Sequence, residues 1–149
     1  MLIVGTGGFI GSCCRYLIGK LVHHIFSLPF PWGTFIVNII GSFLIGVFFG
    51  MAEKMHLFSA QMSIFLITGF CGGFTTFSSF SNEMFLLIQN KQWGYFTAYF
   101  VLSIALGILS VWLGRSVVKP AWYLYLIIFL TVIVYACLLY TSPSPRDVE

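Results

Sequence analysis

Charged side chains are scarce in this chain of 149 residues. Only 7% of the residues carry a charge, seven of them basic and four acidic. Soluble domains carry about 25% charged residues, so this chain has too few to cover a surface that faces water. This composition excludes a soluble enzyme and a disordered segment. The net charge of +3 is also too small and too dispersed to form a phosphate-binding face, which excludes a nucleic-acid-binding protein.

Cysteine and histidine are also few, and their spacing does not suit a metal site. No CxxC pair is present, and no Cys/His spacing is typical of zinc. We expect the four cysteines to be small buried packing residues. The glycine-rich stretch 5–11 does not match a dinucleotide fingerprint, because Ile10 stands where a glycine is required and no strand precedes it. We therefore expect neither a catalytic centre nor a bound nucleotide.

Hydrophobic residues make up 59% of the chain and form several long runs. A spanning helix needs about 20 mostly apolar residues. We therefore predict an all-α, multi-pass membrane protein with four spans, approximately at residues 2–22, 32–51, 61–89 and 93–114. These spans lie within a membrane domain at residues 1–119. A fifth apolar run, a possible extra helix of uncertain origin, occupies residues 120–140, and the polar residues 141–149 resemble an adapter-like, non-native tail.

The third span is too long for one straight crossing, and its middle contains glycine pairs and a cluster of hydroxyl side chains. Such residues are poorly suited to an uninterrupted helix. We predict a break near Gly72 to Thr75. Irregular backbone at membrane depth is tolerated only where it is buried in protein or lines a wet cavity. This segment is therefore the first place to look for a site.

Three polar side chains inside the spans are candidate functional residues. Asn38 lies in the middle of the second span, where its NH2 group can replace the lost water of an anion or clamp two helices together. Arg15, near the end of the first span, can attract an anion or simply extend to the membrane interface. Glu83 is the only acid inside the third span. It can pair with Arg15 or with a helix N-terminus, and the sequence leaves its role open.

Aromatic and hydroxyl side chains recur at helical spacing in the third and fourth spans. Phe77 and Phe80 share a helix face, which Phe74 continues, and the positive edges of their rings can solvate an anion weakly. Core or lipid contact is the alternative for such a stripe. In the fourth span a second stripe offers hydrogen bonds to an ion, unless its serines bond to carbonyls of their own helix. Its members are Tyr99, Ser103 and Ser110.

The loop charges specify orientation weakly. Lys20 and Lys91 lie on one side of the membrane, and the other side holds Lys54, Arg115 and Lys119. Two basic residues against three is a poor positive-inside signal. A chain with so little bias can insert in both orientations, although a small protein with few charges also gives a noisy count.

Three motifs on successive spans resemble those of the Fluc (CrcB-type) fluoride channels. They are GGFIGSCCRY at residues 7–16, GTFIVNIIGSFLIG at residues 33–46 and GFCGGFTTFSSFSNE at residues 69–83. The resemblance implies a four-helix protomer with a broken third helix, in an antiparallel, dual-topology homodimer with two fluoride pores. It implies a passive channel in the cell membrane that exports cytoplasmic fluoride and confers fluoride resistance.

The resemblance also implies roles for particular residues. Asn38 would be the pore amide, Phe77 and Phe80 would present ring edges to fluoride, and Arg15 would lie at the vestibule. Main-chain carbonyls of a broken helix would hold a central structural Na+, two from each subunit. These carbonyls belong to Gly72 and Thr75, and the polar track of the fourth helix would include Tyr99 and Ser103. Gly107 stands where some relatives carry a further hydroxyl.

Two other functions compete with the fluoride channel. A small dual-topology drug exporter is also a short four-span homodimer, but it needs an acid in its first span to couple protons to a cation. The first span here contains Arg15 and no acid. The chain could instead be an accessory subunit of a larger membrane complex, with its glycines serving only assembly. Purified protein that moves no ion by itself would favour that alternative.

Overall fold

A computed structural model describes residues 1–26, 30–55, 58–118 and 131. The chain divides into two compact units, Met1–Val118 and Lys119–Glu149. Apart from Thr131, the expected extra run at 120–140 and the tail at 141–149 lie outside the described residues. The fold and the site are therefore those of the first unit.

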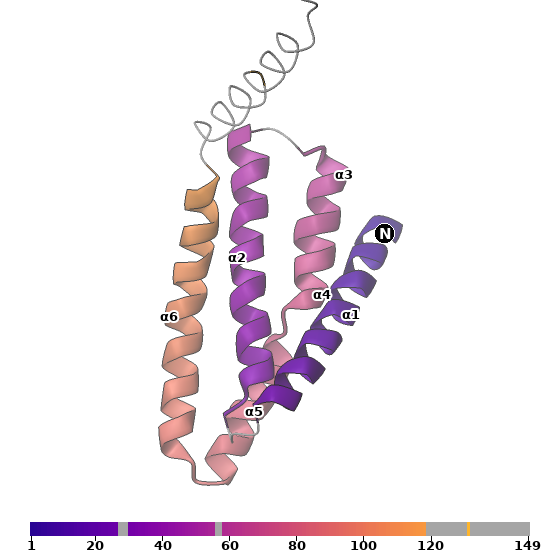
Figure 1. The fold of residues 1–149 in the computed structure, drawn as a ribbon. Coiled ribbons are helices and arrows are strands. Elements are labelled where there is room, and N and C mark those ends of the chain that lie inside the picture. Colours follow the sequence, from indigo (N-terminus) through magenta and orange to yellow (C-terminus); the bar gives the residue numbers. More distant parts are fainter. Residues whose placement is uncertain (27–29, 56–57, 119–130, 132–149) are drawn as a thin grey trace, which may run out of the picture. The chain divides into compact units, whose positions relative to one another are not determined.

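Every regular element in the described residues is a helix (Figure 1). Four stretches are long and apolar enough to cross a membrane: Leu2–Ile25, Trp32–Glu53, Ala60–Gln89 and Trp93–Val117. The prediction of an all-α, multi-pass membrane protein is confirmed. The elements in chain order are α1 (Leu2–Ile25), α2 (Trp32–Met55), α3 (Ala60–Ser63), the π-helix η1 (Ile64–Cys71), α4 (Gly72–Phe74), α5 (Phe77–Gln89) and α6 (Trp93–Val117).

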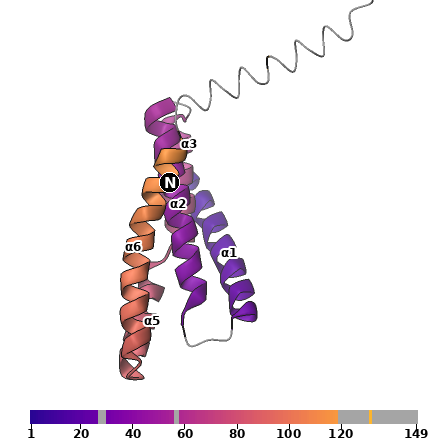
Figure 2. The ribbon, with the colours of Figure 1, turned by 60° about the vertical axis from the view of Figure 1, so that its left-hand side comes forward.

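The helices of this unit pack as two groups, which are joined by contacts between α1 and α2. Helix α2 packs along α6, while α1 packs along η1 and α4. Figure 2 shows α1 inclined beside α2, with α5 lower along α6. The third span thus lies against α1 before its break and against α6 after it, which places the break between the two groups.

Glycines let the paired helices approach until their backbones touch. A Cβ atom on Gly11 of α1 would overlap the carbonyl oxygen of Phe70, and one on Gly73 of α4 would overlap that of Gly8. Gly46 of α2 and Gly114 of α6 are equally restricted, by Val111 and Phe43. Helices associate in lipid through close packing of this kind, because lipid provides no hydrophobic driving force for their association.

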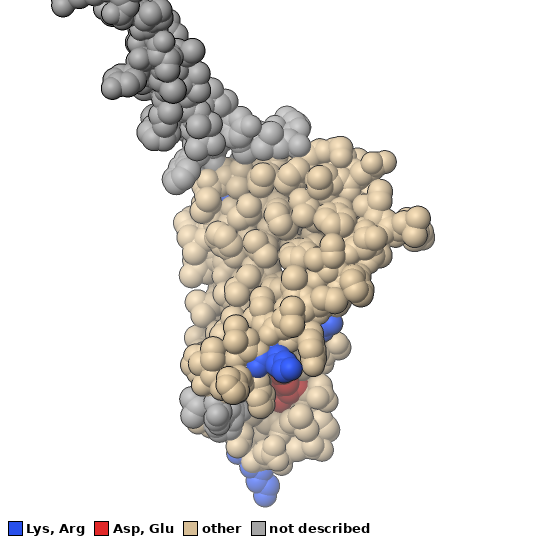
Figure 3. Space-filling model, turned by 45° about the vertical axis from the view of Figure 1, so that its right-hand side comes forward, with Lys and Arg blue, Asp and Glu red and all other residues tan. Residues whose placement is uncertain are grey.

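The outer surface of the unit is strongly apolar. Phe9 on α1 is 72% exposed, and Ile108 and Trp112 on α6 are 68% and 63% exposed. Most of the face in Figure 3 carries no acidic or basic side chains. Those that are visible lie mainly in its lower half. Elsewhere Glu53 and Arg115 form an ion pair between α2 and α6. Such a surface suits acyl chains with charges near the membrane boundaries.

The cysteines differ in burial. Cys71 is buried at the end of η1, as expected for a small packing residue, whereas Cys13 on α1 is exposed. The expectation was wrong for Cys13 because α1 turns only one face, that of its glycines, toward the third span. Cys137 lies outside the described residues.

The third span is interrupted as predicted, but the interruption follows the glycine pair instead of including it. Gly72 lies in the helical segment α4, and the backbone becomes extended at Thr75 (φ −79°, ψ 158°) and Thr76 (φ −148°, ψ 117°). Gly73 has a packing role, since α1 lies too close for a side chain there. The hydroxyl residues end one helix and begin the next, and the eight-residue π-helix η1 before them was not predicted.

The seam between α1 and the third span gives a stability prediction. We expect Gly11→Ala to lower the free energy of unfolding by about 1–3 kcal/mol, because the new methyl group must push two backbones apart. Gly5→Ala, on the same helix, is the matched control, since a Cβ there meets nothing within 4 Å. Thermal unfolding in detergent measures both. Equal melting temperatures for the two variants would contradict a tight seam.

Candidate functional site

The side chain of Asn38 bridges α2 to the break in the third span. The backbone N–H of Thr76 donates to Asn38 Oδ1 at 2.9 Å, and Asn38 Nδ2 donates to the carbonyl oxygen of Thr76 at 3.2 Å. One carboxamide therefore pairs with both backbone groups of an extended residue at membrane depth, where an unpaired group is costly. The clamp interpretation of Asn38 describes this geometry, and the second N–H of its Nδ2 is left for a further partner.

Other side chains pair with the helix ends that the break creates. Thr76 caps α5, because its hydroxyl accepts the N–H of Ser79 at 3.4 Å. On the other side, Ser12 of α1 donates to the carbonyl oxygen of Gly73 at 3.3 Å, and the Thr75 hydroxyl donates to that of Cys71 at 2.9 Å. The break is thus held by hydroxyl and amide side chains from three spans.

Two carbonyl groups at the break lose the donors that a continuous helix would supply. The N–H of Thr76, which would bond to the Gly72 carbonyl, donates to Asn38 instead. The N–H of Ser79, which would bond to the Thr75 carbonyl, donates to the Thr76 hydroxyl. No cluster of three or more His, Cys, Asp or Glu that suits a metal occurs among the described residues. Hard cations bind such carbonyl oxygens, so Gly72 and Thr75 fit a Na+ ligand set chemically.

A cavity of 350 Å³ adjoins the break and brings together four of the predicted pore residues. Asn38 of α2, Phe77 and Phe80 of α5 and Ser103 of α6 all line it. The ring centroids of Phe77 and Phe80 are 6.1 Å apart. The Ser103 hydroxyl is buried and has no hydrogen-bond partner in the described part of the chain. The remaining lining residues are Gly41, Ser42, Ile45, Thr75, Thr76 and Ile104.

Phe74 does not belong to the stripe of Phe77 and Phe80, so that expectation was wrong. Phe74 lies before the break, is buried, and stacks on Phe70 with a centroid distance of 5.7 Å. The i, i+3 relation holds only within one continuous helix, and the two extended residues at the break remove it. By contrast, Phe77 is 79% exposed on the protomer.

The Glu83 carboxylate lies between two hydroxyl groups. Thr34 of α2 donates to Oε1 at 2.6 Å, and Tyr99 of α6 donates to Oε2 at 2.7 Å. These bonds answer the question of its partners, which the sequence left open. Thr34 was missed, although it precedes Asn38 by one helical turn and so shares its face. Hydrogen bonds to a charged group are the stronger ones, so this trio ties three spans together.

Tyr99 is fully buried and lies beside the cavity of Asn38 without lining it. Its ring packs on Phe80 at 4.9 Å between centroids and on Phe30 at 5.3 Å, while its hydroxyl is bonded to Glu83. Of these two members of the predicted polar track, only Ser103 lines this cavity. Tyr99 instead connects a Phe ring of the cavity to the carboxylate of the next turn of α5.

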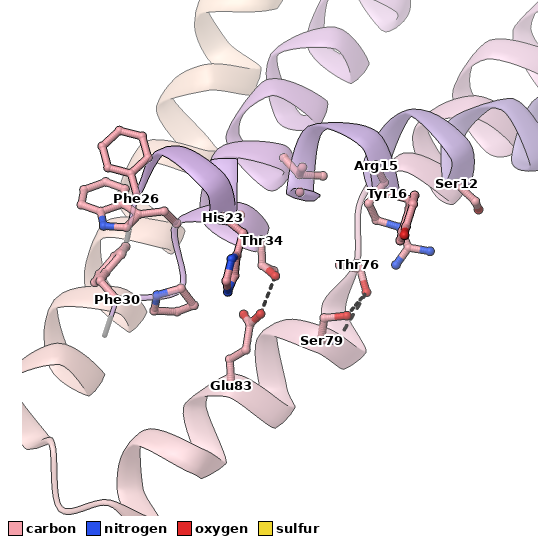
Figure 4. A pocket seen from close by; sticks show the side chains of 15 residues that line it. Ser12, Arg15, Tyr16, His23, Phe26, Phe30, Thr34, Thr76, Ser79 and Glu83 are labelled. Carbon is pink, nitrogen blue, oxygen red and sulfur yellow. Dashed lines mark hydrogen bonds between the residues drawn. The ribbon is translucent and has the colours of Figure 1, made fainter. Parts of the chain in front are cut away.

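A larger cavity of 630 Å³ lies among α1, α2 and α5 (Figure 4). Arg15, predicted at a vestibule, lines it, and Glu83 lies on the opposite wall in the close-up view. Thr76 lines both cavities, so both border the helix break. The other residues that line the larger cavity are Ser12, Tyr16, Gly19, His23, Phe26, Phe30, Pro31, Trp32, Gly33, Thr34, Val37 and Ser79.

Comparison with known proteins identifies relatives along most of the chain. A family model described as "CrcB-like protein, Camphor Resistance (CrcB)" matches residues 2–115. Three similar proteins are each named fluoride-specific ion channel FluC. That of Flavobacterium psychrophilum is 43% identical over 116 residues, covering 78% of this chain and 94% of the relative. That of Bacteroides fragilis is 46% identical over 117 residues, covering 76% of this chain and 91% of the relative. That of Leptospira interrogans is 40% identical over 119 residues, covering 80% of this chain and 94% of the relative.

The clamp at Asn38 gives a second stability prediction. Asn38→Leu leaves the N–H and carbonyl groups of Thr76 without their partners, and we expect it to lower the free energy of unfolding by about 1–3 kcal/mol. Ser42→Ala, one turn further along α2 and on the same cavity, serves as the control. Chemical or thermal unfolding of the purified proteins compares them. An Asn38→Leu protein as stable as the Ser42→Ala protein would refute the clamp.

Proposed function

The chain belongs to the CrcB-like family, and from this membership we propose that it is a passive, fluoride-selective channel that exports cytoplasmic fluoride across the cell membrane. One observation supports this proposal above the others. Asn38, Phe77, Phe80 and Ser103 surround one cavity beside a helix break at membrane depth. Amide and hydroxyl donors with aromatic edges suit a small anion, and the proposed transport makes and breaks no covalent bond.

The cavity offers an anion weak neutral contacts. Of the two N–H groups on Asn38 Nδ2, one donates to Thr76, and we assign the other to fluoride. The buried Ser103 hydroxyl supplies a second donor, and the edges of Phe77 and Phe80 carry partial positive charge. Neutral donors hold an anion less tightly than a full positive charge does, which permits it to leave again.

Fluoride would reach this cavity through the larger one. Arg15 supplies positive charge on the α1 wall, and Thr76 borders both spaces. A basic side chain in a cleft raises the local concentration of anions and their rate of access. Tyr99 would position other residues without lining this cavity, because its ring packs on Phe80 and its hydroxyl donates to Glu83.

A second copy of the chain would complete the pore. Phe77 is 79% exposed although it lies on the cavity, so this wall is open on the protomer. We propose an antiparallel homodimer with two pores, in which the partner covers this wall. The nearly balanced loop charges support dual insertion, because they give neither orientation a clear advantage.

A structural Na+ would lie at the break of the third span. The carbonyl groups of Gly72 and Thr75 have each lost their helical donor, and two from each protomer would give four oxygen ligands. Oxygen ligands suit a hard monovalent cation. We assign this ion a structural role, which is to hold the two broken helices of the dimer together.

Fluoride efflux from liposomes tests the proposed function. We expect rapid fluoride release from vesicles that contain the purified protein, read with a fluoride electrode, and no chloride release from matched vesicles. Asn38→Asp should abolish the fluoride flux, because a negative charge in the path repels the anion. Undiminished flux in Asn38→Asp would remove Asn38 from the pathway. A folded protein that moves no ion would favour the accessory-subunit alternative.

The aromatic edges have their own test. Phe80→Ile removes a ring from the cavity, and we expect it to reduce fluoride flux at least tenfold while the protein keeps its oligomeric state, since about 1.4 kcal/mol of lost stabilisation suffices. Phe85→Ile is the matched control, because Phe85 lies on the same helix and is 56% exposed outside the cavity. Loss of the dimer in Phe80→Ile would show that this ring serves packing.

A further inference from the structure

We propose that His23 collects fluoride at the outer end of the larger cavity and that protonation of its imidazole increases fluoride conduction. The inference rests on the proposed channel function and adds to it a proton-dependent residue. His23 lies in the last turn of α1, is exposed, and lines the 630 Å³ cavity. Figure 4 shows its ring near Thr34, above the Glu83 carboxylate.

One face of α1 forms a polar wall from the helix break to the end of the helix. Ser12, Tyr16, Gly19 and His23 follow one another at intervals of four, three and four residues, so they share a face, and all line the cavity. Ser12 is bonded at the break through the Gly73 carbonyl, and Arg15 lies one residue from this row. An anion that enters along this wall therefore passes His23 before it meets Arg15.

The two charged side chains that line the larger cavity beside His23 are of opposite sign. On the cavity side, Arg15 carries a positive charge on α1 and Glu83 a negative charge on α5, with Tyr16 beside them on α1. Helix α2 faces this space with Trp32 and Thr34, which are uncharged, and Tyr99 of α6 reaches it only through its bond to Glu83. His23 also lines a third cavity, together with Lys20 and His24, so the Lys20 ammonium lies on its other side.

A proton on His23 changes this balance. Histidine is the side chain that gains its charge between about pH 8 and pH 5. A second positive charge on the same cavity, in addition to that of Arg15, outweighs the Glu83 carboxylate and raises the local fluoride concentration. A unit charge some 8 Å from an ion in water changes its local concentration about two- to threefold at low ionic strength. We expect fluoride conductance to rise by this factor on acidification.

Single-channel recording in planar bilayers tests this proposal without interference from neutral hydrogen fluoride, which crosses lipid but carries no current. Fluoride conductance is measured with the same solution on both sides, at about pH 8 and about pH 5. We expect the full-length protein to conduct about two- to threefold more at the lower pH. High salt should reduce the ratio, because it screens exposed charges.

Three variants assign the response to this imidazole. His23→Gln should abolish the pH response, and His23→Lys should give the higher conductance at both pH values. His24→Gln is the matched control and should keep the full response, because His24 lines the third cavity and not the larger one. His23 is exposed, so these substitutions leave the packing of α1 largely intact.

Each contrary outcome overturns the inference in a distinguishable way. Equal conductance at both pH values in the unaltered protein would refute it while leaving the channel function standing. A full response in His23→Gln would assign the pH dependence to another group and refute the role of His23. Absence of fluoride current from every protein at both pH values would overturn the proposed function together with this inference.

Discussion

Every backbone N–H and carbonyl group inside a membrane needs a partner, and this constraint governs the site. The extended residues Thr75 and Thr76 interrupt the third span and leave backbone groups without helical partners. Asn38 pairs with both backbone groups of Thr76, and the Thr76 hydroxyl caps the following helix. The same bonds divert donors from the carbonyls of Gly72 and Thr75. The arrangement that stabilises the break therefore also exposes the oxygens proposed to bind a cation.

The glycines make this arrangement possible, because they bring the neighbouring helices close enough for short side chains to reach. Gly11 and Gly73 place α1 directly against the third span, and from there Ser12 can bond to the Gly73 carbonyl. Close packing also places Thr34, Asn38 and Glu83 between the spans. Two cavities that share Thr76 result, one bordered by charged side chains and one by neutral donors and aromatic rings. Attraction and selection are thus assigned to different places.

Sequence patterns predicted the helices and the interruption of the third span well, because the length of apolar runs responds directly to bilayer thickness. They were less reliable where two structures compete for the same residues. The pair Gly72–Gly73 was expected to break the helix, yet it remains helical, and Gly73 instead makes room for α1. Phe74 was grouped with Phe77 and Phe80 because helical spacing was counted across the break, whereas Phe74 stacks on Phe70 before it. The π-helix η1 had no recognised signal in the residues.

Composition and periodicity alone determined that residues 1–118 contain four membrane-spanning stretches, with amide, aromatic and hydroxyl side chains within them. They also supplied the motifs that resemble fluoride channels. Only the tertiary structure decided which of these side chains meet. It directed Tyr99 and Thr34 to Glu83, left Ser103 buried beside Asn38, and placed His23 on the same cavity as Arg15. The physical reason is that these contacts join different spans, and spacing along one helix carries no information about its neighbours.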